Sequence, residues 1–158
     1  MKIKQKYLNL WLIILLMLAV PVLFLSCDDD DDIDDIVLTV AGNASGAQEV
    51  PAVTTTASGT LSGTFNDNTN ELQWAISWNG LSGDVVAAHF HGPAAAGTNA
   101  PPVIPINITT SYGSSGSLTG TEILNATVEG YLKAGTLYYN LHTATHPDGE
   151  IRGQVTAN

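Results

Sequence analysis

The sequence predicts an all-β domain, an antiparallel β-sandwich with Greek-key connections and one short helix. Gly, Thr, Ser, Asn and β-branched residues dominate residues 36–158, and few windows show helical periodicity. Short runs of alternating apolar and polar residues are separated by turn signals at intervals of about ten residues, which is typical of sandwiches. The 123 residues of this segment are enough for one domain and too few for two.

The first strands form a predicted hairpin. In ELQWAISWNG the apolar residues alternate with polar and small ones, so they share one face of a strand. The alternating run SGTLSGTF precedes it, and residues 66–70 between the two runs carry turn-forming side chains. Without a disulfide the sandwich depends on its apolar core, whose leading expected members are Phe65, Trp74, Trp78 and Phe90.

The next strand carries two histidines, in AAHFHGPAAAG. Side chains at positions i and i+2 of a strand share a face, so His89 and His91 should point the same way, about 7 Å apart. Val86, Ala88 and Phe90 should then fill the opposite face. If Phe90 enters the core, the two histidines face outward or into a cleft.

An edge strand or bulge is expected in PVIPINIT. Ile104, Ile106 and Ile108 share one face of this run. Pro105 has no N–H to donate to a sheet ladder, so it is suited to an edge or a bulge.

The helix is expected at residues 126–133, ATVEGYLK. Asn125 can cap its N-terminus, and Gly135 can end it. The runs TLYYNLHT and GEIRGQVTA that follow give two more strands, joined by the turn ATHPDG.

Residues 1–26 have the features of a lipoprotein signal peptide. Three lysines precede an apolar run at residues 10–25. Sixteen residues would make a helix of roughly 24 Å, which is short for a bilayer core of about 30 Å. Such a run suits the apolar region of a secretory signal, and an uncleaved N-terminal anchor is the alternative.

The only cysteine, Cys27, follows that run directly. The letters FLSC resemble the lipobox of bacterial lipoproteins, in which the cysteine is acylated and becomes the mature N-terminus. Acyl chains would anchor the protein to a membrane, because each buried CH₂ contributes about 0.8 kcal/mol. A thiol without a modification is the alternative.

An acidic tether is expected after the cysteine, within residues 27–35. Seven of the eight residues from Asp28 to Asp35 are acidic, and like charges repel one another. Calcium binding is an alternative, although the turn-forming Gly of the usual calcium loop is absent. Acids in this place also resemble the sorting signals of surface-exported lipoproteins in some Gram-negative phyla. The expected location is therefore extracytoplasmic, at a bacterial outer membrane or cell surface.

The charge balance excludes nucleic acid as a partner. Without residues 1–26 the chain would keep only Lys133 and Arg152 against 15 acidic residues, a formal charge of −13. Binding to phosphates needs Lys and Arg side chains to neutralise them.

Three motifs follow one another along the chain: SGAQEVPAVTTTASGTLSGTF, AAHFHGPA and LYYNLHTATHPDGEIRGQV. In this order they resemble the CHRD domain, a module named after the animal protein chordin and found singly in bacterial secreted proteins. The resemblance runs from about Leu38 to Val155. It implies an immunoglobulin-like β-sandwich outside the cytoplasm and implies no reaction. The residues on family-typical positions are His89, His91, His142, Glu150 and Arg152.

One interpretation of the histidines is a transition-metal site. His89 and His91 would hold zinc or copper, with His142 from a neighbouring strand as the third ligand. His146 and Glu150 are additional candidates, although His146 stands where the resemblance leads us to expect Asn.

The other interpretation is structural. The histidines would form hydrogen bonds across strands, to the backbone or to Glu150, and Arg152 would pair with Glu150 or with a carboxylate at a strand end. Both interpretations remain open at this point.

Taken together, these features predict a lipid-anchored extracytoplasmic CHRD domain protein. We expect a non-enzymatic binding or structural module with an unidentified protein or envelope partner, and no catalytic residue is assigned. No nucleophile elbow, phosphate loop or dinucleotide fingerprint occurs. A zinc- or copper-binding protein is the alternative. A further one is an enzyme, such as one similar to copper–zinc superoxide dismutase, which also uses a His-x-His pair.

Overall fold

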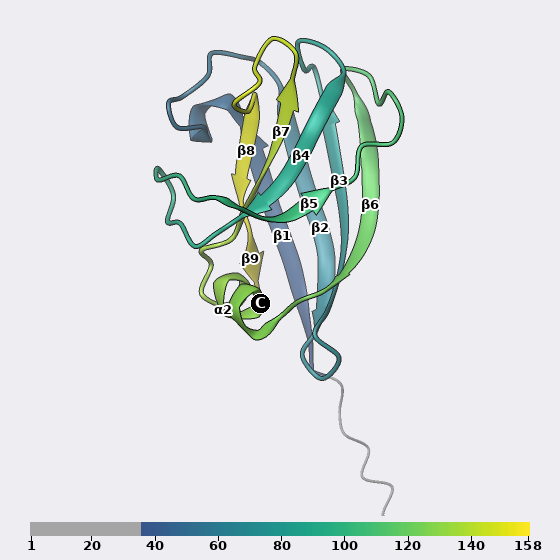
Figure 1. Cartoon of the computed structure of the whole chain (residues 1–158), viewed down its shortest axis with the longest axis vertical. Helices are drawn as coiled ribbons and strands as arrows, with labels where there is room; N and C mark the ends of the chain where they lie inside the picture. The colour runs from purple at the N-terminus through teal and green to yellow at the C-terminus, as the bar shows by residue number, and fades with distance from the viewer. Residues whose placement is uncertain (1–35) are drawn as a thin grey trace, which may run out of the picture. The chain divides into compact units, whose positions relative to one another are not determined.

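The computed structural model describes residues 36–158, which form a β-domain (Figure 1). The expectations for residues 1–26, for the tether and for Cys27 lie outside the described residues. In chain order the elements are β1 (Val37–Ser45), the 3₁₀ helix η1 (Gly46–Gln48), β2 (Ser58–Asn66), β3 (Glu71–Asn79), β4 (Val85–His91), β5 (Pro102–Ile106), β6 (Gly116–Ile123), α2 (Ala126–Lys133), β7 (Tyr138–Thr143), β8 (Ile151–Gln154) and β9 (Thr156–Ala157).

The strands form one curled antiparallel sheet in the order β5-β4-β7-β8-β1-β2-β3-β6, with β9 beside β1. The pairing of β8 with β1 consists of Ser45 opposite Arg152, so the sheet turns there and its two halves face each other. Trp74 of β3 and Phe90 of β4 meet between the halves, with ring centroids 5.7 Å apart. The predicted all-β class is confirmed, and the arrangement is sandwich-like.

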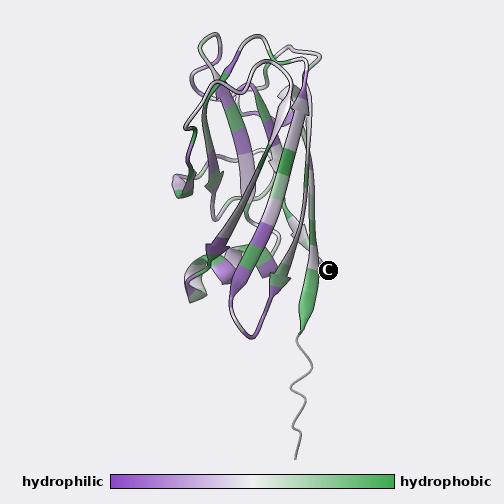
Figure 2. Ribbon diagram, turned by 90° about the vertical axis from the view of Figure 1, so that its right-hand side faces the viewer, coloured by the Kyte–Doolittle hydropathy of each residue, from purple (hydrophilic) through white to green (hydrophobic). Residues whose placement is uncertain are grey.

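The core lies between the two halves and contains the four expected aromatic residues. Phe65 and Phe90 are 0% exposed, Trp78 is 4% and Trp74 is 9% exposed. Buried and exposed positions alternate along β2 and β3, as the sequence predicts. Figure 2 shows hydrophobic and hydrophilic residues following one another along the strands. Burial of these rings stabilises the fold by roughly 25 cal/mol per Å² of apolar surface.

The local elements form where their signals lie. β2 and β3 pair over their full length, from Ser58 opposite Asn79 to Asn66 opposite Glu71, which confirms the hairpin. The tight turn is closed by Asn70, which takes the left-handed conformation with φ 57°.

Asn125 caps α2, and its Oδ1 accepts hydrogen bonds from the N–H groups of Thr127 and Val128, each at 3.0 Å. Gly135 follows the helix with φ 66°, and β5 lies at a sheet edge as Pro105 predicts. Within residues 36–158, no helix is long and apolar enough to cross a membrane.

A bulge in β4 corrects the prediction for the inner face of that strand. The register against β7 shifts between Val85 and Ala87. Val85 is therefore buried at 2% exposure, and Val86 is 53% exposed instead of facing the core. Ala88 and Phe90, beyond the bulge, are buried as expected. The extra residue shifts the alternation by one position, which strict two-residue spacing cannot indicate.

Candidate functional site

The predicted histidines lie on the face of β4 and β7 that is turned away from Phe90. His89 is opposite Asn140 in the ladder, His91 is opposite Tyr138, and His142 is opposite Ala87. Because alternate residues of a strand share a face, the three imidazoles and the Asn140 amide meet on one side of the sheet. The β4–β7 pairing joins strands that are far apart in the chain (Figure 1).

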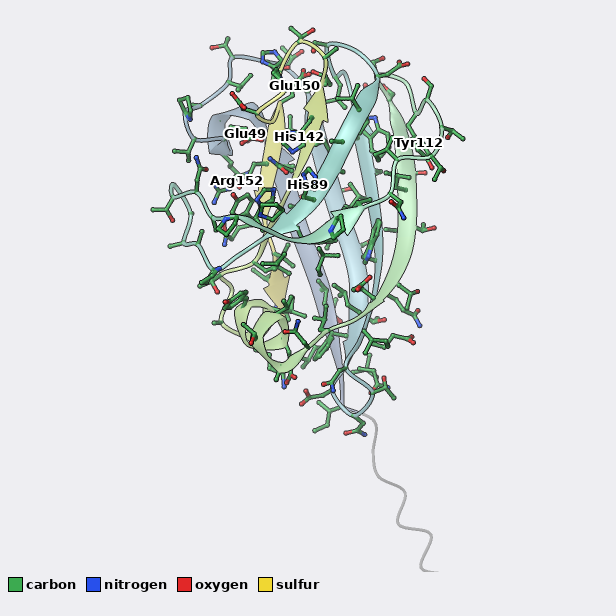
Figure 3. All side chains as sticks on the ribbon, in the orientation of Figure 1. Glu49, His89, Tyr112, His142, Glu150 and Arg152 are labelled. Carbon is green, nitrogen blue, oxygen red and sulfur yellow. The ribbon has the colours of Figure 1, made fainter. Side chains whose placement is uncertain are left out.

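The structure brings three of the candidate ligands together and leaves two apart. One ring nitrogen from each of His89, His91 and His142 lies within 4.8 Å of the others. His89 Nδ1 is 3.1 Å from His142 Nε2, and Figure 3 shows these two side chains near each other between β4 and β7. His146 lies in the turn after β7, where its N–H bonds Thr143, and Glu150 lies in a separate cluster.

Hydrogen bonds to backbone carbonyls fix the orientation of two of the three rings, those of His91 and His142. His91 Nδ1 donates to the carbonyl of Ala100 at 2.9 Å, and His142 Nδ1 donates to that of Pro147 at 2.9 Å. A neutral imidazole that donates through Nδ1 has its lone pair on Nε2. The two Nε2 atoms lie 3.0 and 2.9 Å from the same atom, Asn140 Oδ1.

The environment favours neutral imidazoles. Burial lowers the pKa of His91 and of His142, and the hydrogen bonds to Ala100 and Pro147 offset this only in part. Burial also lowers the pKa of His89, and the neighbouring His142 and His91 lower it further, because their protonated forms would repel a second positive charge. Neutral imidazole is the form that binds transition metals.

Arg152 joins β8 to the loop that follows β4. Its guanidinium carbon lies 3.5 Å from the ring centroid of Tyr138, and the Tyr138 ring also stacks with His91 at 4.7 Å. The guanidinium donates to Asn99 Oδ1 at 3.2 Å. With 1% exposure, Arg152 is almost completely buried, and its charge acts on Glu49 instead of pairing with Glu150.

Glu150 is a fully buried carboxylate surrounded by donors. Its Oε1 accepts from the Ser82 N–H at 2.9 Å and the Thr55 hydroxyl at 3.1 Å. Its Oε2 accepts from the hydroxyls of Ser82 at 2.6 Å and Thr143 at 2.8 Å. Burial alone would raise the pKa of Glu150, but these hydrogen bonds together hold it below its usual value.

Glu49 is the residue of this region that the sequence reasoning missed. It is 7% exposed, and burial raises its pKa to about 7, although the charge of Arg152 and a hydrogen bond from Asn140 act in the opposite direction. Among the described side chains, its Oε1 is a buried oxygen without a hydrogen-bond partner. Its place in the QEVP motif was the one available signal, because the surrounding letters carry no periodicity that marks burial.

The family model described as the CHRD domain matches residues 40–155, from β1 to the residue after β8. No curated protein and no solved structure matches the chain. The family match covers the three histidines, Glu49, Glu150 and Arg152.

Proposed function

We propose that this chain, which belongs to the CHRD domain family, is a lipid-anchored, extracytoplasmic module of the cell envelope. A CHRD domain implies a non-enzymatic module. We further propose that this domain presents a rigid binding or structural unit to an envelope partner.

The proposal of a non-enzymatic module rests on the contacts of two charged residues of the family-typical motifs, Glu150 and Arg152. Glu150 accepts four hydrogen bonds from three residues, and Arg152 covers the ring of Tyr138. A carboxylate in this state is a weak general base, because its lone pairs are already occupied and its pKa is lowered. Both side chains instead join segments that are distant in sequence, as expected of a scaffold.

The envelope location rests on Cys27 and the acids after it. A diacylglycerol on this thiol together with an acyl chain on the α-amino group would give stable membrane attachment. Eight tether residues would reach at most about 26 Å. Their negative charge would be repelled by anionic lipid headgroups, which supports a domain held away from the membrane surface.

Metabolic labelling with a fatty-acid analogue tests the anchor. The full chain should incorporate the label and stay in the membrane fraction after a high-salt wash. Cys27→Ser should lose both properties, whereas the tether variant Asp30→Asn, which keeps the thiol, should behave as the unchanged chain does. Label on Cys27→Ser, or release of the unchanged chain by salt, would refute the lipid anchor.

A further inference from the structure

We propose that His89, His91 and His142 form a binding site for a divalent transition metal, either zinc(II) or copper(II). This inference goes beyond the envelope module proposed above and does not depend on the anchor. It rests on the direction of the ring nitrogens, on the balance of donors and acceptors, and on the chemistry of the donor set.

The ring nitrogens point in the directions that a metal site requires. His91 and His142 use Nδ1 for a backbone carbonyl, and both direct Nε2 to the middle of the cluster. Metal-binding histidines typically donate their other N–H to a carbonyl or carboxylate, which fixes the ring and its tautomer. Two rings held in this way, on two strands, converge with His89 Nδ1.

The cluster holds more acceptors than donors. The atoms that face the middle of the cluster are one nitrogen of each of the three rings and Asn140 Oδ1. The amide nitrogen of Asn140 does not face the cluster, because it donates a hydrogen bond to Glu49. A hydrogen on His89 Nδ1 satisfies the lone pair of His142. In the neutral form that carries its hydrogen on Nδ1, His91 directs the lone pair of Nε2 at Asn140 Oδ1, 3.0 Å away, and neither atom then supplies a hydrogen. A cation bound between these atoms would be coordinated by their lone pairs, which otherwise repel each other.

The cationic side chains of the described residues are used elsewhere. Lys133 pairs with Asp67 and Glu129 beside α2. Arg152 lies over Tyr138 and bonds Asn99. A bound ion would supply the positive charge that these acceptors favour.

The donor set selects the class of ion. Within residues 36–158 the metal-ligating cluster consists of imidazoles alone, and imidazole suits zinc and copper, whereas calcium and magnesium prefer oxygen. Zn–N bonds of about 2.0–2.1 Å place neighbouring ligand nitrogens about 3.3 Å apart, close to the 3.1 Å between His89 and His142. The widest pair, up to 4.8 Å apart, would close on binding, and the half-buried His89 is the ring with most room to move. Three ligands leave a fourth position for water or a further ligand.

Metal titration of the full chain in detergent, after removal of metal with a chelator, tests the site. Zinc(II) and copper(II) are added separately, and binding is followed by calorimetry and by the melting temperature. We expect one equivalent of metal and a melting temperature several degrees higher. His89→Ala should bind at least tenfold more weakly, and His146→Ala, which removes a histidine outside the cluster, should bind as the unchanged chain does.

His89→Ala is suited to this comparison because His89 is the least buried of the three rings, and circular dichroism checks that the variant is folded. His89→Gln, which keeps a polar side chain without an imidazole, should show the same loss of affinity. The proposal is overturned if the unchanged chain binds neither metal, if His89→Ala and His89→Gln keep full affinity, or if His146→Ala loses as much as they do. Anchor labelling of the same samples reports on the envelope proposal separately.

Discussion

Glu49 and Glu150 are both buried carboxylates, and their hydrogen bonding sets them apart. Glu150 receives four hydrogen bonds, whereas Oε1 of Glu49 has no partner among the described residues. Correspondingly, the pKa of Glu150 is lowered and that of Glu49 is raised to about 7. At the residue scale, the ionised carboxylate of Glu150 thus stabilises the fold, whereas an ionised Glu49 destabilises it.

The substitution Glu49→Gln should change how stability depends on pH. The folded chain holds the Glu49 proton more tightly than the unfolded chain, so stability falls as pH rises from 4.5, the ordinary pKa of a glutamate, to about 7, its pKa in the fold. We expect a loss of roughly 2 kcal/mol over this range, since each pKa unit is worth about 1.4 kcal/mol and water screens a part. In Glu49→Gln most of this loss should disappear, as measured by urea unfolding at pH 5 and pH 8.

The matched control is Glu122→Gln at an exposed position of β6, which should keep the pH dependence of the unchanged chain. If Glu49→Gln loses as much stability between the two pH values as this control, the buried carboxyl does not carry the effect.

The substitution Glu150→Gln should destabilise the fold by about 2–4 kcal/mol at pH 7, because an amide NH₂ replaces an oxygen that accepts hydrogen bonds. The pKa of Glu150 is lowered, so its contribution is present above the pKa of the unfolded chain and is lost as pH falls through the folded pKa. The difference between the two proteins should therefore shrink at pH 3. Equal stability of both at pH 7 in a denaturant titration would contradict this prediction.

At the scale of elements, β4 shows where a pattern of alternation stops being informative. The hairpin of β2 and β3 and the limits of α2 follow from local signals, such as the Asn125 cap, which act within a few residues. The bulge between Val85 and Ala87 depends on pairing with β7, which lies about 50 residues later in the chain. Local sequence carries no mark of that pairing.

The histidine cluster could likewise be predicted only in part from the sequence. His142 could be predicted as the third member from its place on a strand. The carbonyls of Ala100 and Pro147, which orient the rings, could not be predicted. Every residue has a backbone carbonyl, so the residue type does not indicate which carbonyl will bond a histidine. Glu49 was missed because its burial arises from the contacts of Gly149 and Asn140, both distant in the chain.

Two neighbouring valines provide a test of the bulge. Val85→Thr places a hydroxyl in the core and should cost about 1–3 kcal/mol. Val86→Thr, at an exposed position, should change the free energy of unfolding by less than about 0.5 kcal/mol. Chemical denaturation of both variants measures the difference. A larger cost for Val86→Thr would mean that the strand follows the simple alternation.

At the scale of the whole molecule, polar clusters join the parts of the curled sheet. Glu150, directly before β8, binds the loop before β2, the turn before β4 and the end of β7. Arg152 binds the loop after β4. The three histidines differ from these residues, because their inner nitrogens are directed at one another. The domain therefore separates into a hydrogen-bonded scaffold and the three histidines that we propose as metal ligands.

Thermal unfolding with and without one equivalent of zinc(II) tests this separation most directly, in the unchanged full chain, Glu150→Gln and His89→Ala. Glu150→Gln should melt at a lower temperature than the unchanged chain and still gain stability from zinc. His89→Ala should melt close to the unchanged chain without metal and gain nothing from zinc. If zinc(II) raises the melting temperature of His89→Ala as much as that of the unchanged chain, or if Glu150→Gln melts at the temperature of the unchanged chain, the division into a scaffold and a metal-binding histidine cluster is contradicted.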